Sequence, residues 1–489
     1  MSRSTSRAPF FPSEEGTRLL ISRLMLAKVL ETLETLAHIG ERYDGLFPSI
    51  IDRRQSTMLR ELPPAIPGQR DGDRSHLGSN LIHDEATLLT MFALAQTEDR
   101  PGLAAAADAY LETFAQRCTR TLTGLYPWGE HSFWHLEEGR IGNSYRVRDP
   151  GRPAQTTHDH LRAAPIWLWE KLHAFRPECV ESFADGLEGH WTEGAPPEYI
   201  RHALIEEKRP HPRGDRSCDF PRHGGFYILD WAFAYAAGGR PERLAQTEKM
   251  ADYWWPLRDD AGLLLIESRS PADDSRFFQV NAPGQTLSLA VSFLEAAERL
   301  PSELAATMQE RASVYIDGFL AAPHDLEGEK YVLASRRDGG DPVTLMPVWG
   351  SRYGVWPAAY VALTCLCGFR LTDDERLLGW AIAVGRSLLR TPFPIADTVP
   401  AMDAGLGIGL LADLYDLTGS DEWLSGGLEV CQRIGELYFD DLPLPRGASG
   451  IDWYESQMGP GFLLHGIARM SLLVRDGRPC PLTADYTAR

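Results

Sequence analysis

The stretch that decides the fold is Phe226-Tyr-Ile-Leu-Asp-Trp-Ala-Phe-Ala-Tyr-Ala-Ala-Gly-Gly-Arg-Pro-Glu-Arg-Leu-Ala-Gln-Thr-Glu-Lys-Met-Ala-Asp-Tyr-Trp254. Its first half, Phe226–Ala237, is poor in charge and rich in small and aromatic residues, which is typical of a buried helix. A Gly-Gly-Arg-Pro break follows, because glycine ends helices and proline can start the next one. The second half carries a polar face, as a surface helix does. The stretch therefore predicts a tight helical hairpin with one inner and one outer helix.

The same unit recurs along the whole chain. Six such pairs are expected near residues 84–121, 161–188, 226–254, 285–320, 354–390 and 405–438. The two remaining helices, near 17–43 and 459–474, supply a seventh pair that closes a ring. The sequence thus predicts an all-α (α/α) toroid of seven pairs, or six if the weak 161–188 pair is miscounted. Residues 1–489 form a single domain in this interpretation, with 1–15 as an extended N-terminal arm.

Composition excludes several classes of function. The chain has 489 residues, with 49 Lys+Arg against 68 Asp+Glu, for a formal net charge of −19. Binding to nucleic acid or to an anionic membrane through a general basic surface is not expected. No apolar run approaches a membrane span and no signal peptide is evident, which predicts a cytoplasmic protein. The seven cysteines are scattered and odd in number, which indicates reduced thiols.

The connections that lead from each outer helix to the next inner helix are long. They cover residues 44–83, 122–160, 189–225, 255–284, 321–353, 391–404 and 439–458. In this topology they all emerge where the inner helices begin, so they are expected to converge on one functional mouth. A few short strands are expected among them, for example at 262–268 and 277–280.

These loops concentrate histidine, arginine and aromatic residues. Residues 209–225 hold four arginines and two aspartates, a local charge of 4 − 2 = +2 in a chain at −19. Such a segment favours an acidic ligand, unless its arginines pair with carboxylates on the rim. His158-Asp-His160, or His131 with His135, could place two metal ligands, but no HExxH or CxxC spacing is present, so neither a metal nor another cofactor is predicted.

Four motifs carry a resemblance to a known family. They are Pro67-Gly-Gln-Arg-Asp-Gly-Asp-Arg74 with the following Asn80-Leu-Ile-His-Asp84, Trp128-Gly-Glu-His131, His158-Asp-His-Leu-Arg-Ala-Ala-Pro165 and Arg222-His-Gly-Gly-Phe-Tyr227. Together they resemble the helical-toroid polysaccharide lyases, and most closely polysaccharide lyase family 38, whose members act on glucuronan or alginate. The likeness extends from about Gly45 to Leu464.

The resemblance implies metal-independent β-elimination of a 4-linked polyuronate, leaving a C4–C5 unsaturated uronate. The partner would be an acidic polysaccharide or oligosaccharide. Tyr227 is the expected base, since Arg222 and His223 precede it at an inner-helix start and nearby cations lower a phenol's pKa. By analogy with such lyases, His158 or His160 would neutralise the substrate carboxylate together with Arg222 and Asn80. The expected substrate-binding residues are Arg74, His83, Trp128, Glu130, His131, Trp349, Arg352, Tyr353 and Tyr454.

Other functions fit the same toroid. A glycoside hydrolase of uronic-acid oligosaccharides would use paired carboxylates, drawn from Glu130, Asp159 and Asp84. A sugar 2-epimerase would use a pair of histidines. A non-catalytic carbohydrate-binding toroid is the fourth possibility, and the density of titratable residues in the loops argues against it. The oligomeric state does not follow from the sequence.

Overall fold

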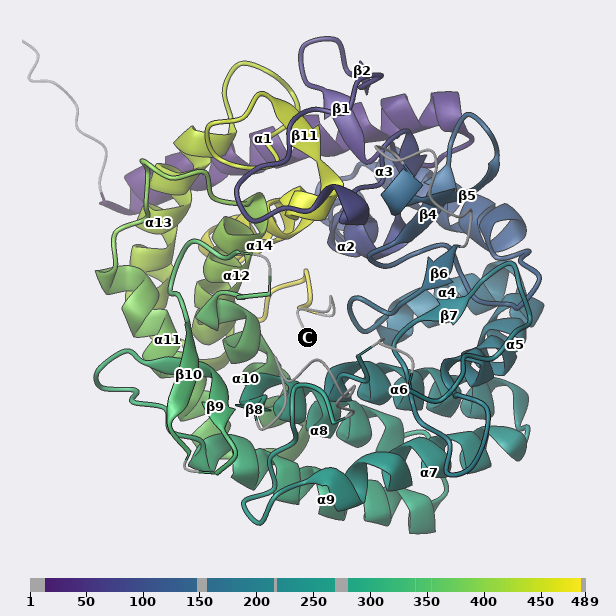
Figure 1. The fold of residues 1–489 in the computed structure, drawn as a ribbon. Helices are drawn as coiled ribbons and strands as arrows, with labels where there is room; N and C mark the ends of the chain where they lie inside the picture. Colours follow the sequence, from purple (N-terminus) through teal and green to yellow (C-terminus); the bar gives the residue numbers. More distant parts are fainter. Residues whose placement is uncertain are drawn as a thin grey trace, which may run out of the picture.

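The computed structural model describes residues 14–146, 156–214, 218–268, 280–338, 340–352 and 354–484. Within them, fourteen α-helices form a ring of antiparallel pairs (Figure 1). The helices are α1 Glu14–Gly40, α2 Leu81–Thr97, α3 Pro101–Thr113, α4 Ile166–Phe175, α5 Pro177–Gly186, α6 Pro221–Gly238, α7 Glu242–Trp254, α8 Pro283–Ala297, α9 Ser302–Ala321, α10 Ala358–Thr372, α11 Glu375–Arg390, α12 Ala401–Thr418, α13 Asp421–Tyr438 and α14 Pro460–Asp476. The seven-pair toroid is therefore confirmed, and the weak pair near 161–188 is α4 with α5.

The ring has two layers. The inner helices pack side by side in the order α6, α8, α10, α12, α14 and α2, while α1 packs against α14, α13 and α3 and so completes the outer layer. The layers differ in burial as the sequence pattern predicts, since α12 is buried at every position from Ala401 to Leu414. The predicted extended arm at 1–15 ends sooner than expected, because α1 already begins at Glu14; residues 1–13 lie outside the described part.

Small residues let the inner helices approach closely. A Cβ atom on Gly405 of α12 would lie 2.2 Å from the carbonyl carbon of Phe462 in α14, so no larger residue fits without moving one of the two helices. Gly405-Leu-Gly-Ile-Gly409 is thus a helix-packing sequence.

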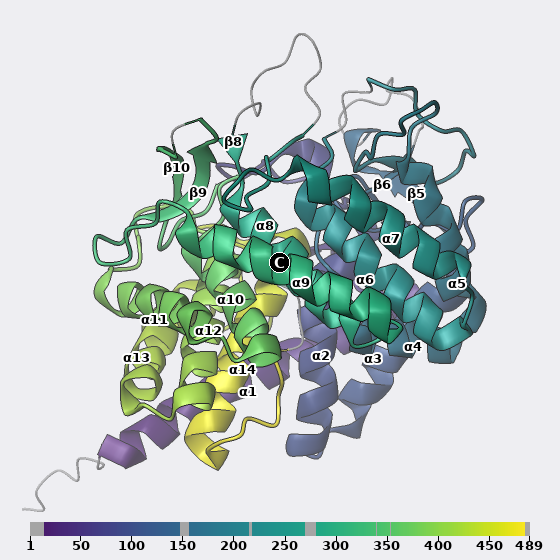
Figure 2. The same cartoon turned by 90° about the horizontal axis from the view of Figure 1, so that it is seen from below.

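Short strands lie in the long loops. They are β1 Ile50–Asp52, β2 Thr57–Met58, β3 Gly78–Ser79, β4 Ser132–His135, β5 Arg140–Asn143, β6 Thr157–His158, β7 Ala203–Leu204, β8 Val280–Asn281, β9 Tyr331–Arg336, β10 Pro342–Met346 and β11 Trp453–Glu455. They pair in antiparallel fashion as β11-β1-β2, β10-β9-β8, β3-β4-β5 and β6-β7. Figure 2 shows β5, β6, β8, β9 and β10 at the same end of the ring. This end is the predicted mouth.

The structure treats the two segments predicted as strands, 262–268 and 277–280, separately. Gly262–Ser268 is not a strand, and only Leu265 forms a bridge there, with Asn281. Two backbone hydrogen bonds flank this bridge, from Ile266 N to the Val280 carbonyl and from Ala282 N to the Leu264 carbonyl, both at 2.8 Å. Of 277–280, residues 277–279 lie outside the described part, and Val280 begins β8.

Two further sequence predictions concern the chain as a whole. All seven cysteines fall in the described part and none forms a disulfide. No helix in the described ranges combines the length and the apolar character that crossing a membrane requires.

Candidate active-site cleft

The mouth of the toroid holds two adjoining cavities, of about 280 Å³ and about 90 Å³. Arg70, Glu130, Leu161 and Trp356 line both of them, so the two form one cleft, called the mouth cleft below. Its walls come from the loops before α2, α4, α6, α8, α10, α12 and α14. The loops therefore converge on one cleft, as the topology predicted.

Five arginines line the mouth cleft: Arg70, Arg162, Arg201, Arg222 and Arg352. Two of them have carboxylate partners. Arg70 contacts Asp73 at 2.7 Å and Glu130 at 3.3 Å, and Arg201 contacts the same Glu130 at 3.2 Å.

Two further arginines of the cleft, Arg162 and Arg222, are buried and have no carboxylate within ion-pair distance among the described residues. Arg162 is 3% exposed and donates a hydrogen bond to the backbone carbonyl of Ile82 at 3.3 Å. Arg222 is 7% exposed, lies over the ring of Trp356 and keeps its Nε without a hydrogen-bond partner in the described part of the chain. Burying a charge without a counter-charge is costly, so both guanidinium groups are available to an anionic ligand.

The positive segment predicted at 209–225 contributes less positive charge to the mouth cleft than its count of four arginines suggested. Of its three arginines that the structure describes, Arg222 is the one that lines the mouth cleft. Arg209 and Arg213 are exposed and pair with Glu207 and Glu198. Arg216 lies outside the described residues. The positive charge of the cleft comes mainly from other loops.

One pair of carboxylates faces the mouth cleft. Oxygens of Asp73 and Glu130 lie within 4.8 Å of each other and of a nitrogen of His131. Burial, opposed by the Arg70 guanidinium and helped by the charge of Glu130, raises the pKa of Asp73 to about 6. A carboxyl group whose pKa is raised in this way can act as an acid beside a second carboxylate. This pair differs from the predicted set, because Asp84 is buried against the Tyr110 hydroxyl and Asp159 lies behind the cleft wall.

The two candidate histidines of the His-x-His motif have different surroundings. The indole of Trp128 donates to His158 Nε2 at 2.9 Å, and His158 Nδ1 lies 2.9 Å from His190 Nε2, whose Nδ1 in turn lies 2.8 Å from the carbonyl of Ile200. Because an indole only donates, each ring must be neutral and carry its proton on Nδ1. Burial lowers the pKa of both histidines, to about 3 for His190. His158 therefore has no free nitrogen for a substrate.

His160 supports the cleft from behind. Its Nδ1 lies 2.5 Å from the carbonyl of Arg162, and its Nε2 lies 3.0 Å from Asp230 Oδ2. Asp230 also accepts from the indole of Trp169 at 3.0 Å. His160 is fully buried, so it acts on the cleft through the segment that carries Arg162.

Tyr227 lies deep in the inner wall and does not line the mouth cleft. Its side chain is fully buried, with its ring centroid 4.6 Å from that of His190 and 5.9 Å from that of Tyr199. The expected lowering of its pKa is wrong: burial, followed by the charge of Asp159, raises the pKa well above the ordinary value. Arg222 and His223 are close to Tyr227 in the sequence, but they do not lower the pKa of its phenol, because helical packing buries the phenol among other rings. Its neighbour His223 is also fully buried, and burial with the nearby Arg222 charge lowers the pKa of its imidazole.

Several residues predicted for the site, among them the expected carboxylate neutraliser Asn80, make structural contacts instead. Asn80 donates to the Gly129 carbonyl at 2.8 Å and to Ser75 Oγ at 3.2 Å, which uses its amide hydrogens. Arg74 makes two hydrogen bonds to Glu455, at 2.7 and 2.8 Å, and so ties the loop before α2 to the loop before α14. His83, Trp128, His131 and Tyr454 are buried and outside the cleft lining.

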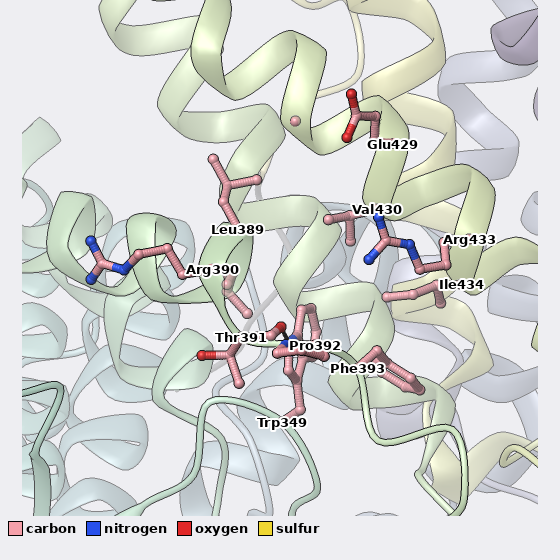
Figure 3. A pocket seen from close by; sticks show the side chains of 12 residues that line it. Trp349, Leu389, Arg390, Thr391, Pro392, Phe393, Glu429, Val430, Arg433 and Ile434 are labelled. Atoms are coloured by element: carbon pink, nitrogen blue, oxygen red, sulfur yellow. Dashed lines mark hydrogen bonds between the residues drawn. The ribbon is translucent and has the colours of Figure 1, made fainter.

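Trp349 belongs to a different pocket (Figure 3). This pocket, of about 210 Å³, lies between the end of α11 and the middle of α13. The Trp349 indole donates to the Thr391 carbonyl at 3.1 Å, and its ring packs against Phe393 at a centroid distance of 5.2 Å. Of the predicted substrate residues, Glu130 and Arg352 do line the mouth cleft. Tyr353 lies outside the described part.

The sequence interpretation assigned no role to several residues of the cleft. Arg70, Asp73 and Arg162 lie inside the motifs quoted above. Their position next to the predicted site residues was the signal that could have identified them. Trp356 and Tyr360 stand near the start of α10, where their rings stack at 5.2 Å. Nothing in the sequence separates these two from core aromatics. In the described part of the chain, Tyr360 is the tyrosine that lines the mouth cleft.

Comparisons with known proteins name no family for this chain. Neither a protein-family model nor a curated protein matches its sequence. Among solved structures, cellobiose 2-epimerase from Bacillus thermoamylovorans B4167 has a TM-score of 0.46 at 10% identity, covering 93% of this chain and 99% of that one. A GH76 α-mannanase from Bacteroides thetaiotaomicron has a TM-score of 0.40 at 12% identity, covering 62% and 82%. An unsaturated glucuronyl hydrolase specific for heparin has a TM-score of 0.42 at 10% identity, covering 81% and 100%. These are toroid carbohydrate-active enzymes, and similarity this distant assigns neither a family nor an activity.

Proposed function

We propose that this protein is a carbohydrate-active enzyme that cleaves a 4-linked polyuronate by β-elimination without a metal in the reaction. The observation that carries the proposal is the pair Arg162 and Arg222, buried at the mouth cleft without a carboxylate partner in the described residues. A uronate carboxylate is the anion that such guanidinium groups bind through paired hydrogen bonds.

The same two arginines fit the chemical requirement of the reaction. A base removes the proton from C5, the C4–O4 bond breaks as the C4–C5 double bond forms, and O4 takes up a proton. Abstraction at C5 is feasible when the adjacent carboxylate is neutralised, which stabilises the negative charge that develops there. Arg162 and Arg222 are proposed as the neutralising groups, with Arg352 at the smaller cavity as a further contact.

Tyr360 is proposed as the group that transfers the proton. It lines the mouth cleft and interacts electrostatically with Arg162, and the positive charge of that arginine favours the phenolate that a base must provide. Tyr227 is the alternative from sequence, and its burial behind the wall argues against direct contact with a sugar. The two tyrosines are distinguishable by parallel substitution.

One assay tests the reaction. The protein is incubated with glucuronan, alginate and pectate, with and without chelator, and ultraviolet absorbance of the C4–C5 double bond is followed together with reducing ends. Elimination produces both signals, and a reaction without a catalytic metal continues in the presence of chelator as long as circular dichroism shows that the protein stays folded. Reducing ends without that absorbance would reject the lyase.

A second candidate, a glycoside hydrolase of uronic-acid oligosaccharides, rests on a separate observation. Asp73 and Glu130 form the pair of carboxyl groups at the mouth cleft that such a reaction uses. Oxygens of the two lie within 4.8 Å of each other, closer than the about 6.5 Å or more by which inverting enzymes separate their two carboxyl groups. In the same assay this enzyme releases reducing ends alone.

A further inference from the structure

A group of potential metal ligands lies directly behind the mouth cleft. One ligand-capable atom from each of His131, Asp159 and His202 lies within 4.8 Å of the other two. His131 and Asp159 are buried, and none of the three lines the cleft. This group, the His-Asp-His cluster, differs from the His158/His160 and His131/His135 pairs considered from the sequence.

The three residues come from three separate loop positions that the small sheets bring together. His131 directly precedes β4, Asp159 directly follows β6, and His202 directly precedes β7. Strands β6 and β7 are paired, with His158 opposite Ala203, so Asp159 and His202 stand at the same end of that pair. An atom bound here would connect the loop before α4 with the loop before α6.

Asp159 points to a ligand at this place. Its side chain is fully buried, and Oδ1 accepts a hydrogen bond from the backbone of Glu130 at 2.7 Å. Oδ2 has no hydrogen-bond partner, and no basic side chain of the described residues lies within ion-pair distance of this carboxylate. A buried carboxylate without an ion pair, with one oxygen lacking a hydrogen bond, destabilises the folded state, and a bound cation would supply the missing interaction.

The surrounding charges distinguish this group from the neighbouring one. Asp73 and Glu130 also lie near His131, but Arg70 contacts both and Arg201 contacts Glu130. Asp159 has no such direct ion pair among the described residues, and the charges of His131 and Arg201 act on it from a greater distance. One carboxylate and two imidazoles are a typical ligand set for zinc and related divalent ions, with the remaining positions taken by water.

We propose that His131, Asp159 and His202 bind one divalent transition-metal ion, with zinc as the first candidate. The ion holds the two loops that carry Glu130 and Arg201 against each other and touches no substrate. It is therefore a structural site, independent of whether the enzyme is a lyase or a hydrolase.

The test uses the full-length protein without substrate. After treatment with chelator and dialysis, zinc, manganese and calcium are titrated separately by calorimetry, and the thermal midpoint is recorded with each. Cobalt is added in parallel, because its visible absorption reports the geometry of the ligands. We expect one equivalent of zinc, a higher thermal midpoint and a cobalt spectrum of low coordination number.

Variants separate this site from adventitious binding. Asp159→Asn keeps the acceptor for the Glu130 amide and is expected to weaken zinc binding at least about tenfold, as His202→Gln is too. His135→Gln is the matched control, since His135 on β4 contacts Glu138 and stands outside the cluster, and it should bind zinc as the unmodified protein does. Absence of binding in the unmodified protein, or equal binding in Asp159→Asn, would overturn the proposal.

Discussion

His160 donates a hydrogen bond to the backbone carbonyl of Arg162, across a distance of 2.5 Å between Nδ1 and the carbonyl oxygen. The guanidinium of Arg162 lines the mouth cleft, while the imidazole of His160 is fully buried. A histidine that sequence similarity placed on the substrate therefore fixes the backbone of a residue that lines the mouth cleft.

This relationship predicts different effects for two substitutions of His160. Asparagine places an amide donor close to the position of Nδ1 and should keep most of the activity on polyuronate. Alanine removes the donor and should lower kcat/KM at least about tenfold, mainly through KM, because Arg162 loses its fixed position. Steady-state kinetics of the two variants provide the measurement. Equal losses in both would assign the effect to the Asp230 contact instead.

Arg222 should be more important for activity than for stability. Arg222→Met removes a buried charge that has no carboxylate partner in the described residues, so the thermal midpoint should stay unchanged or rise. Activity on polyuronate should fall at least about 100-fold, as it does when a group that stabilises developing charge is lost. The exposed Arg209 pairs with Glu207. Arg209→Met is the control, and it should change neither the thermal midpoint nor the activity on polyuronate. A large loss of stability in Arg222→Met would show a structural role.

The two tyrosines are compared by removing one hydroxyl at a time. Tyr360→Phe should lower kcat at least about 100-fold, since proton transfer by a positioned side chain contributes that much. Tyr227→Phe should retain most of the activity, because its phenol lies behind the wall with a pKa well above the ordinary value. Ultraviolet assays at saturating substrate, with circular dichroism to check folding, decide between them. The reverse pattern would return the proton-transfer role to Tyr227.

Asp403 should make stability depend on pH. It accepts hydrogen bonds from the backbone of Gly350 and Ser351, at 3.0 and 2.7 Å, and so holds the loop that leads to Arg352. Burial raises its pKa from 3.8 to about 6. An acid whose pKa is raised by folding stabilises the folded state while it is protonated. The free energy of unfolding should therefore fall by on the order of 3 kcal/mol as the pH rises from about 4 to about 6.

Asp403→Asn isolates this contribution. The amide oxygen can accept both backbone hydrogen bonds, and no ionisation remains. The free energy of unfolding of Asp403→Asn, relative to the unmodified protein, should therefore increase between about pH 4 and about pH 7. Urea unfolding across this range gives the difference directly. A difference that is constant with pH would mean that Asp403 titrates normally in the folded protein.

The helical architecture was accessible from sequence because its signals are local. The apolar face of Phe226–Ala237, the Gly-Gly-Arg-Pro break and the polar face that follows lie within one hairpin, where spacing along the chain equals position on the helix. Repeated hairpins of this kind also build open superhelices, and it was the two unpaired terminal helices, near 17–43 and 459–474, that favoured a closed ring of seven pairs.

The contents of the mouth cleft were decided by tertiary structure. Arg162 and Arg222 belong to loops or helix starts without periodicity, and their orientation depends on elements distant in sequence. Tyr227 was expected to face the substrate, yet packing against His190 and Tyr199 turns its ring into the wall.

The sequence by itself determined that the chain is a ring of helical pairs with its chemically active residues in the loops at one end. Tertiary structure alone decided which of these residues meet. His131, Asp159 and His202 stand far apart in the chain and come together only where β4, β6 and β7 bring their loops to one place. The physical reason is that a helix is specified by hydrogen bonds and burial within a few turns, whereas a site built from loops is specified by long-range packing that no local pattern records.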